Sequence, residues 1–430
     1  MDAPTSLPPT STTPAPRRFG QREMVALLAG MMALNALALD TMLPALPAIE
    51  RDLGVGDANH AQWVIVAYIL GFGSSQMLWG PLADRFGRKP VLAAGVALYI
   101  LFAFLAASAQ SFALLIAARV AMGASAAVSR VLVLAIVRDL YAGARMASVM
   151  SLVHMVFMVV PVVAPSIGQA ILAVGTWRLI FYALGGYGCV LFVWSMVRLT
   201  ETLDPAFRRP VSVASLADGV GRTLRDRLSL GYTLALTSIY ATLIAYLASV
   251  QQIVGEVFGR PGDIGLIFAA IAGPMSLASW TNSRIVGRFG LRRVGHSGLI
   301  AFCVLTASHL AWDTLAGSTM TSFAVLMGAT MIAFAFCSAN FGTLAMTNMA
   351  PIAGTASSTQ GTLSTIVGAL IGAGIGQAYD GTLAPFLAGL TGIGLLALAI
   401  VTITERAHLF GKDAPGDFDD AEATEKETDD

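Results

Sequence analysis

The chain has 430 residues, of which 56% are hydrophobic and only 12% are charged. This composition is too apolar for a soluble domain and indicates a protein that crosses a membrane many times. The formal net charge is zero, and this total identifies no class of partner because the charges of a membrane protein are sorted by side.

The N-terminal stretch differs from the chain that follows it. Residues 1–20 are rich in Pro, Ser and Thr and lack the short apolar core and the small-residue cleavage site of a signal peptide. We expect residues 1–21 to form a disordered cytoplasmic tail.

Apolar runs then recur along the chain, each about 20 residues long, which is the length needed to cross roughly 30 Å of hydrocarbon. They predict an all-α integral membrane protein with twelve transmembrane helices near residues 24–48, 61–83, 90–108, 112–137, 146–173, 177–198, 229–254, 263–284, 294–313, 320–349, 354–379 and 382–403. An even number of spans places both termini on the same side of the membrane.

The cationic residues decide which side that is. Of the 26 arginines and lysines, 21 fall in tails and turns on the side of the termini, three fall on the other side, and two lie within spans. By the positive-inside rule both termini are cytoplasmic. We therefore expect a multi-pass protein of the plasma membrane, the inner membrane of a bacterium.

Asp40 is the only carboxylate well inside a predicted span. A carboxylate in hydrocarbon is costly unless it is protonated, paired or facing a water-filled cavity, so its position makes it a functional candidate. The alternative is an acid near the helix end that reaches the membrane interface.

Arg119 lies at a matching depth, because each residue is about seven positions, or roughly 10 Å, inside the outer end of its span. A cation within reach would make proton release from Asp40 depend on how closely the two helices approach. A purely structural tie to backbone carbonyls is the alternative for Arg119. The other intramembrane arginine, Arg130, lies deeper and either faces a cavity or pairs with helix ends.

The stretch Gly80-Pro-Leu-Ala-Asp-Arg-Phe-Gly-Arg-Lys-Pro90 carries one carboxylate and three cations between two apolar runs. A turn this charged belongs in water, where Gly87 provides the turn and Pro90 restarts a helix. Its spacing resembles the loop between the second and third helices of the major facilitator superfamily, and an ordinary charged turn is the alternative. We expect a cytoplasmic gate formed by Gly80, Asp84, Arg85, Gly87, Arg88 and Arg145, in which Asp84 pairs with Arg145 or caps a helix in the other half.

The fifth predicted span contains Pro161-Val-Val-Ala-Pro165-Ser-Ile-Gly168. Two prolines four residues apart, with small residues around them, allow a helix to kink and to pack closely. Similar runs mark the exporting branches of the superfamily that the chain resembles, although Ala164 stands where Gly is usual. The motif therefore comprises Pro161, Ala164, Pro165 and Gly168, and a kink with no directional meaning is the alternative.

The basic stretch 199–228 divides the spans into two sets of six, within residues 22–198 and 229–404. After the eighth span the charged turn returns as residues 283–293, with Gly287 in place of Asp84. Such parallel repeats are typical of the major facilitator architecture of two six-helix halves. Residues 405–430 are acidic, and we expect a cytoplasmic tail there.

The tenth and eleventh spans sharpen this resemblance. Residues 340–377 resemble the Bcr/CflA branch of multidrug exporters, as do residues 39–49 and 138–141, so the resemblance covers nearly all of 22–404. It implies proton-driven efflux of small amphipathic compounds, with Asp40 and Arg119 at the proton-coupling positions and the proton as the coupling ion in place of any cofactor. Met122 and Leu134 depart from the branch's pattern, so substrate choice does not transfer.

Polar and aromatic residues of the first, second, seventh and tenth spans are the candidates for a substrate cavity. They are Asn35, Tyr68, Tyr240, Tyr246 and Asn340. Packing or hydrogen bonding between helices is the alternative role for each.

These features favour a monomeric transporter whose halves rock around a central site. Its expected partners are a small-molecule substrate, protons and the lipid bilayer, with no nucleic acid. A proton-coupled importer, a narrow-substrate metabolite exporter and a non-transporting membrane sensor remain alternatives. An enzyme, a metal site and an ATP-driven pump are disfavoured, because the spans hold no cluster of His, Cys, Asp or Glu and the chain has no nucleotide-binding P-loop.

Overall fold

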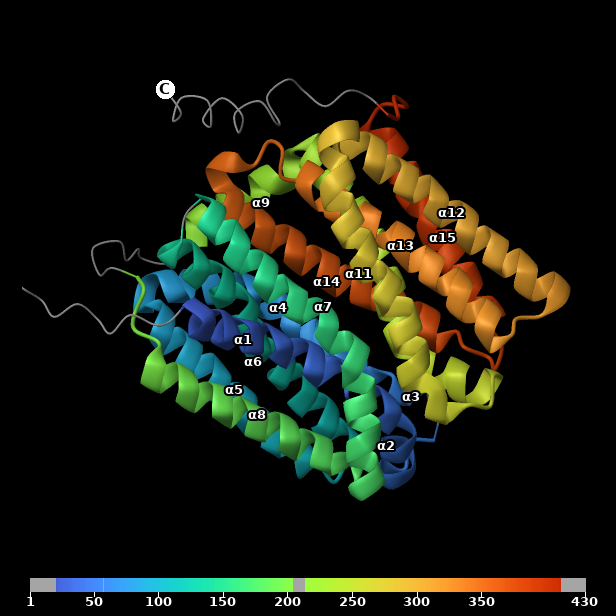
Figure 1. Ribbon diagram of the computed structural model, residues 1–430, viewed down its shortest axis with the longest axis horizontal. Coiled ribbons are helices and arrows are strands. Elements are labelled where there is room, and N and C mark those ends of the chain that lie inside the picture. Colours follow the sequence, from blue (N-terminus) through green and yellow to red (C-terminus); the bar gives the residue numbers. More distant parts are fainter. Residues whose placement is uncertain (1–20, 57, 142, 204–212, 411–430) are drawn as a thin grey trace, which may run out of the picture.

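The computed structural model describes residues 21–56, 58–141, 143–203 and 213–410. The regular structure in these ranges is helical, and the long helices form one bundle (Figure 1). Nearly all of the predicted tail 1–21, most of the tail 405–430 and part of the predicted linker fall outside the described residues.

Twelve helices of the described residues have 20 residues or more, which matches the predicted number of spans. The first six are α1 (Gln21–Asp40), α4 (Trp63–Phe86), α5 (Arg88–Ala107), α6 (Phe112–Leu140), α7 (Gly143–Val174) and α8 (Trp177–Arg198). The second six are α10 (Arg227–Gln252), α11 (Ile264–Phe289), α12 (Leu291–Ala316), α13 (Met320–Leu344), α14 (Ala353–Gln377) and α15 (Ala384–Thr404). Short helices α2 (Leu46–Leu53), α3 (Ala58–Ala61) and α9 (Val213–Arg225) connect them.

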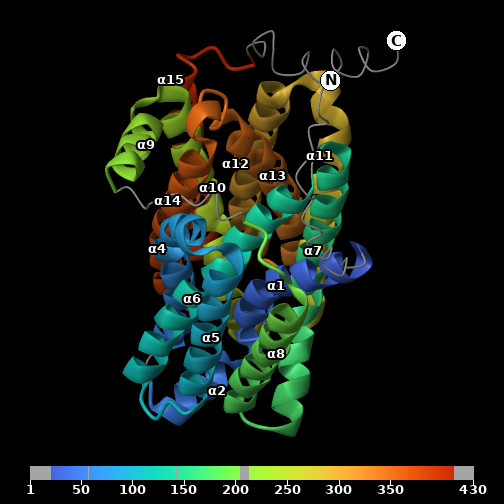
Figure 2. The same ribbon diagram turned by 90° about the vertical axis from the view of Figure 1, so that its left-hand side faces the viewer.

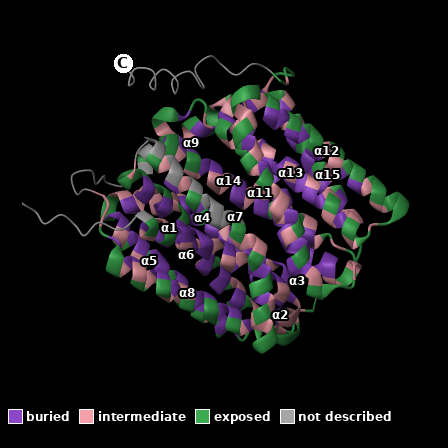
Figure 3. Ribbon diagram, in the orientation of Figure 1, coloured by how far each residue is buried: buried purple, intermediate pink, exposed green. Residues whose placement is uncertain are grey.

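Ten helical segments of the described residues are long and apolar enough to cross a membrane, and the shorter apolar stretch Val159–Val174 lies in α7. Helix α14 is not among these ten segments, because Gly, Ser and Thr recur along it. It packs against both α4 and α10, so its small residues contact other helices. Large apolar side chains such as Val197, Leu315 and Ile403 are exposed, as expected for contact with hydrocarbon. Exposed positions recur along the outer helices, for example α12 (Figure 3).

The first predicted span, 24–48, lies within one helical segment, Arg22–Leu53, that is long and apolar enough to cross a membrane, but this segment is not a regular α-helix throughout. Helix α1 ends at Asp40, a short 3-10 turn covers Leu43–Ala45, and α2 begins at Leu46. Pro44 and Pro47 cause this break because proline has no backbone N–H to donate within a helix. The break places Asp40 at the C-terminal end of α1 rather than inside a continuous helix.

The two halves meet side by side (Figure 2). Helix α4 packs against α14, and α7 packs against α11. We call the end of the molecule that holds α9 and residues 405–410 the near end, and the opposite end, with α2 and α3, the far end (Figure 1). Helix α9 lies within the predicted linker and packs on α10 and α14 of the second half.

Hydrogen bonds between described residues join the halves at the far end and in the middle of the bundle. At the far end the side chain of Gln62 bonds to Gln252 and to the carbonyl of Gly376, and Asn59 bonds to Gln252 and Gln377. In the middle Gln76 donates to the Thr365 hydroxyl. This pattern describes a bundle that is held closed at its far end.

Candidate functional site

A cavity of about 180 Å³ lies between the two halves, with walls from α1, α4, α6, α7, α10, α11, α13 and α14. Most of its wall is apolar or aromatic, including Phe72, Phe268, Met275 and Met331. Four predicted cavity residues line it, namely Asn35, Tyr68, Tyr240 and Tyr246, and so does Asp40. The apolar wall carried no polar signal in the sequence, so only the structure identifies it.

Asp40 is the only carboxylate among the residues that line this cavity. Its side chain is 97% buried, since 3% of its surface remains exposed. No hydrogen bond or ion pair between described residues reaches its carboxylate. The cavity therefore offers one unpaired acid to whatever enters it.

Arg119 is fully buried on α6 and binds backbone rather than an acid. Its Nε atom donates to the carbonyl of Val64 at 2.9 Å, and Nη1 donates to the carbonyl of Ala38 at 3.0 Å. The guanidinium also lies 4.4 Å from the centre of the Tyr68 ring. In this conformation no ion pair joins Arg119 to Asp40, so the described contacts of Arg119 are those of a tie to backbone carbonyls.

The close approach of α4 and α6 sets this arrangement. A side chain at Gly123 of α6 would place its Cβ 2.0 Å from the carbonyl oxygen of Tyr68, so only glycine allows the two helices to lie this close. Tyr68 donates in turn to the side-chain oxygen of Asn35 on α1 at 3.1 Å. Three helices are thereby linked beside the cavity.

Arg130 lines the cavity on the side of α6, with its guanidinium 5.9 Å from the centre of the Phe72 ring. Of the two positions that the sequence left open for this residue, the structure places it at the cavity. The wall thus holds one cation and one carboxylate, both from the first half.

Asn340 does not line the cavity, contrary to the sequence prediction. Its side-chain nitrogen donates to Asn282 at 2.8 Å and to the carbonyl of Phe336 at 2.7 Å, which ties α13 to α11. The cavity contact of α13 is Met331, nine residues earlier, and nine residues of helix span about 13 Å. Asn340 is therefore too close to the near end to reach the cavity.

The residues of the fifth-span motif lie in α7, which continues through both prolines. Pro161 lines the cavity, and Ala164 is buried. A Cβ at Gly168 would lie 2.2 Å from the carbonyl oxygen of Thr41, so this glycine lets α7 approach the break after α1. Pro165 lies between these contacts on the same helix.

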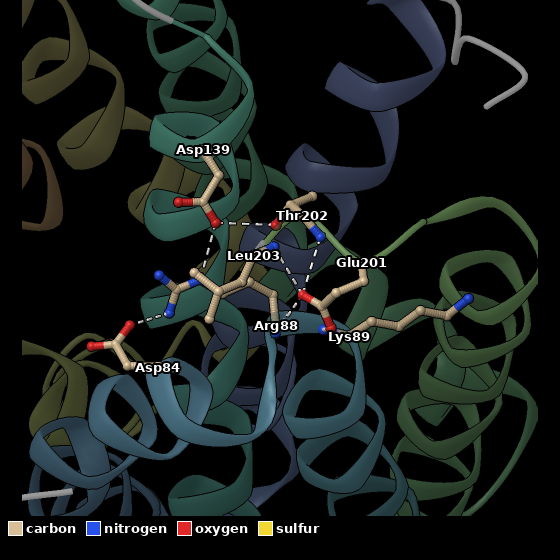
Figure 4. A network of polar contacts seen from close by, with 7 residues as sticks. All are labelled: Asp84, Arg88, Lys89, Asp139, Glu201, Thr202 and Leu203. Carbon is tan, nitrogen blue, oxygen red and sulfur yellow. Dashed lines mark hydrogen bonds and ion pairs between the residues drawn. The ribbon is translucent and has the colours of Figure 1, made fainter. Parts of the chain in front are cut away.

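Two of the predicted gate residues, Asp84 and Arg88, belong to a network of polar contacts at the near end (Figure 4). Arg88 binds Asp84 at 2.6 Å and Asp139 of α6 at 3.0 Å. Glu201 accepts hydrogen bonds from the backbone N–H groups of Arg88 and Lys89, at 2.8 Å and 3.2 Å. The described ion pair of Asp84 is therefore with Arg88, and not with Arg145 or with a helix end of the other half.

The other predicted gate residues are Gly80, Arg85, Gly87 and Arg145. Gly87 adopts φ +99°, which L side chains rarely adopt, and it ends α4. Arg85 and Arg145 are exposed, and Gly80 is partly buried on α4. The sequence analysis did not identify Asp139 and Glu201 as members of this network, although Asp139 belongs to the segment 138–141 that carried part of the family resemblance.

The family model described as Major Facilitator Superfamily matches residues 28–372. The chain belongs to the major facilitator superfamily. Members of this superfamily are transporters, so the chain is a transporter and not an enzyme.

Named bacterial relatives agree with this assignment. The chain is 30% identical over 358 residues to a protein named as an uncharacterized MFS-type transporter, YdgK, of Bacillus subtilis, covering 82% of this chain and 88% of the relative. It is 28% identical over 355 residues to a bicyclomycin resistance protein homolog of Haemophilus influenzae, covering 82% and 89%. It is also 28% identical over 386 residues to the multidrug resistance protein MdtL of Escherichia coli, covering 87% and 92%. These names support the predicted resemblance to drug/proton antiporters of the superfamily.

A solved structure shares the fold. The human organic anion transporter MFSD10 (TETRAN) superposes with a TM-score of 0.63, covering 89% of this chain and 100% of that chain at 17% identity. At this identity the likeness concerns the fold alone.

Proposed function

We propose that this transporter exports small amphipathic compounds in exchange for protons, and that Asp40 carries the proton. The observation on which the proposal rests is the position of Asp40, a buried and unpaired carboxylate in the wall of a cavity shared by both halves. An acid in such a place can bind and release a proton without disturbing an ion pair.

The chemistry of the cavity supports the substrate class. Its aromatic and methionine side chains form adaptable apolar walls, and the hydroxyl groups of Tyr68, Tyr240 and Tyr246 add polar points. A volume of about 180 Å³ is smaller than the roughly 300–1,000 Å³ typical of ligand pockets. Binding of a drug-sized compound therefore requires the halves to separate further around it.

The contacts between the halves support an alternating mechanism. The far end is closed by the amide side chains of Asn59, Gln62, Gln252 and Gln377. With both termini cytoplasmic, the far end faces outward, so the described state is closed toward the outside. The transporter acts as a monomer in the inner membrane, takes up its compound from the cytoplasmic side, and accepts a proton at Asp40 from outside.

The test is proton movement in proteoliposomes with an imposed pH gradient, on adding a panel of amphipathic compounds. We expect the native protein to move protons when a substrate is added, and Asp40→Asn to bind the compound without proton movement. Asp218→Asn is the matched control, because Asp218 pairs with Arg222 on the surface of α9, far from the cavity. Drug-induced proton flux that persists in Asp40→Asn would place the proton elsewhere, and no flux with any compound would refute multidrug export.

A further inference from the structure

A second hollow lies outside the central cavity, on the second half. It is a groove of about 650 Å³ between α11, α12 and α13, and it lies at the near end of the molecule. Small and apolar side chains form its walls, among them Gly298 and Ala301 of α12 and Ala329, Ile332 and Phe336 of α13. We call it the α12–α13 groove.

The α12–α13 groove runs from the end of α12 into the membrane-spanning part of the bundle. From Arg293 to Ala301 the helix rises about 12 Å, and both residues are exposed. A polar peptide that entered this depth would leave backbone groups without partners in hydrocarbon. A hydrocarbon chain matches both the depth and the apolar walls.

The near end of the groove is positively charged. Arg293 lines it, and Arg284 and Arg288, which belong to the same charged segment 283–293, are exposed at the end of α11. Among the described residues none of these three arginines has a carboxylate within ion-pairing distance. Arg284 and Arg288 stack instead on Trp280 and Phe289, at 4.1 Å and 5.5 Å from the ring centres, an arrangement suited to the membrane interface.

The internal repeat shows that this charge is a difference between the halves. In the first half the turn contains Asp84, which together with Asp139 neutralises Arg88. In the second half Gly287 occupies the position of Asp84, and the described carboxylate that reaches the turn is Glu405, which binds Arg292 at 3.0 Å. The second turn therefore holds four arginines and meets one described carboxylate, whereas in the first turn two carboxylates bind Arg88 and Arg85 is the exposed cation.

At the charged end of the groove, Phe410 from the segment after α15 forms one side. Phe410 lines the groove, and its backbone N–H donates to Nδ1 of His296 at 3.2 Å. Its ring also meets the His296 ring edge-on, with the ring centres 5.8 Å apart. The head of the groove is thus a shaped pocket bounded by Phe410 and Arg293.

We propose that the α12–α13 groove binds an anionic phospholipid from the leaflet on the side of the termini. Arg293 binds the phosphate, together with Arg288, which stacks on the groove residue Phe289, and an acyl chain lies between α12 and α13. The acidic residues 413–430 have the right charge to compete for Arg293. They contain Phe418 as their single large apolar side chain, so they lack the means to fill the apolar walls.

The experiment measures lipid binding to the delipidated full-length protein by native mass spectrometry, with phosphatidylglycerol compared with phosphatidylcholine. We expect phosphatidylglycerol to bind more tightly, and Arg293→Gln to weaken it about fivefold, as expected for one cation at a membrane surface. Ala301→Trp should also weaken binding by filling the apolar part of the groove. Arg225→Gln and Val304→Trp are the matched controls, because Arg225 is exposed on α9 and Val304 is exposed on α12 outside the groove.

Three results would overturn the proposal. Equal binding of the two lipids would show that the headgroup is not selected. Phosphatidylglycerol binding that is unchanged in both Arg293→Gln and Ala301→Trp would place the lipid elsewhere. Binding that requires removal of residues 411–430 would make the acidic tail the occupant of the groove.

Discussion

Nη1 of Arg119 donates a hydrogen bond to the carbonyl oxygen of Ala38, two residues before Asp40. The cation on α6 therefore holds the end of α1 through its backbone, and the carboxylate of Asp40 stays unpaired. Arg119 is thus connected to the proposed proton site through the main chain rather than through an ion pair.

Replacing Arg119 by Ala should destabilise the protein as well as impair transport. The carbonyls of Ala38 and Val64 would each lose a buried partner, at a cost of about 1–3 kcal/mol apiece. Thermal unfolding in detergent, followed by intrinsic fluorescence, measures this, with Arg225→Ala as the exposed control. Arg119→Lys should fall between the two, because one amine can satisfy a single carbonyl. An unchanged melting temperature for Arg119→Ala would show that these hydrogen bonds contribute nothing to the fold.

Replacing Gln62 by Leu should open the far end. The substitution removes the hydrogen bonds to Gln252 and to the carbonyl of Gly376, which join the two halves. Spin labels at the exposed residues Arg51 and Asp380, in a protein without its three cysteines, report the separation by pulsed electron paramagnetic resonance. We expect the long-distance population to rise about tenfold for a loss of roughly 1.4 kcal/mol.

The control for that measurement is Gln251→Leu. Gln251 is a buried neighbour whose side-chain oxygen has no hydrogen-bond partner in the described part of the chain, so its loss removes no link between the halves. If Gln251→Leu and Gln62→Leu gave the same distance distribution, the amide contacts would not be what holds the far end closed.

Replacing Glu405 by Gln should lower the stability of the second half in a pH-dependent way. Burial alone would raise the pKa of Glu405, but hydrogen bonds from Tyr232 and Arg292 outweigh it and hold the pKa below its ordinary value of 4.5. A carboxylate with a lowered pKa stabilises the folded state above that ordinary value, and the stabilisation is lost as the pH falls through the lowered pKa. We expect a difference of about 1.5–3 kcal/mol between the native protein and Glu405→Gln at pH 7.

The same two proteins show whether the charge of Glu405 causes this difference in stability. Melting temperatures measured from pH 7 down to pH 3 should converge as Glu405 becomes protonated. A difference that stays constant over this range would mean that the substitution acts through packing and not through the charge of Glu405.

The periodic apolar runs predicted the helices well, because hydrocarbon demands long apolar segments. They could not predict the end of α1, since an apolar run continues through Pro44 and Pro47 and conceals the break. Tyr68 and Tyr240 were found at the cavity because polar atoms inside a span stand out. Phe268 and Met275 were not found, because apolar side chains look the same whether they contact lipid, core or cavity.

Contacts between segments that are distant in the sequence are harder to predict. Asp84 and Arg88 lie four residues apart in the sequence, yet the contact of Arg88 with Asp139 depends on how α5 packs against α6. Asn340 was placed at the cavity from its residue type, and its depth along α13 decided otherwise. Sequence predicts which residues are unusual in a membrane, and three-dimensional packing decides what each of them meets.

The break after α1 divides the first span into two helical segments. The segment beyond it, Leu46–Leu53, lies beside Gln62 and Gln252 at the far end, while α1 itself borders the cavity. The two segments meet close to Asp40, and each can move with the different part of the bundle that it contacts. We expect a change in the charge of Asp40, the proposed proton carrier, to shift the Leu46–Leu53 segment without rotation of the whole helix, because the two segments meet close to this residue.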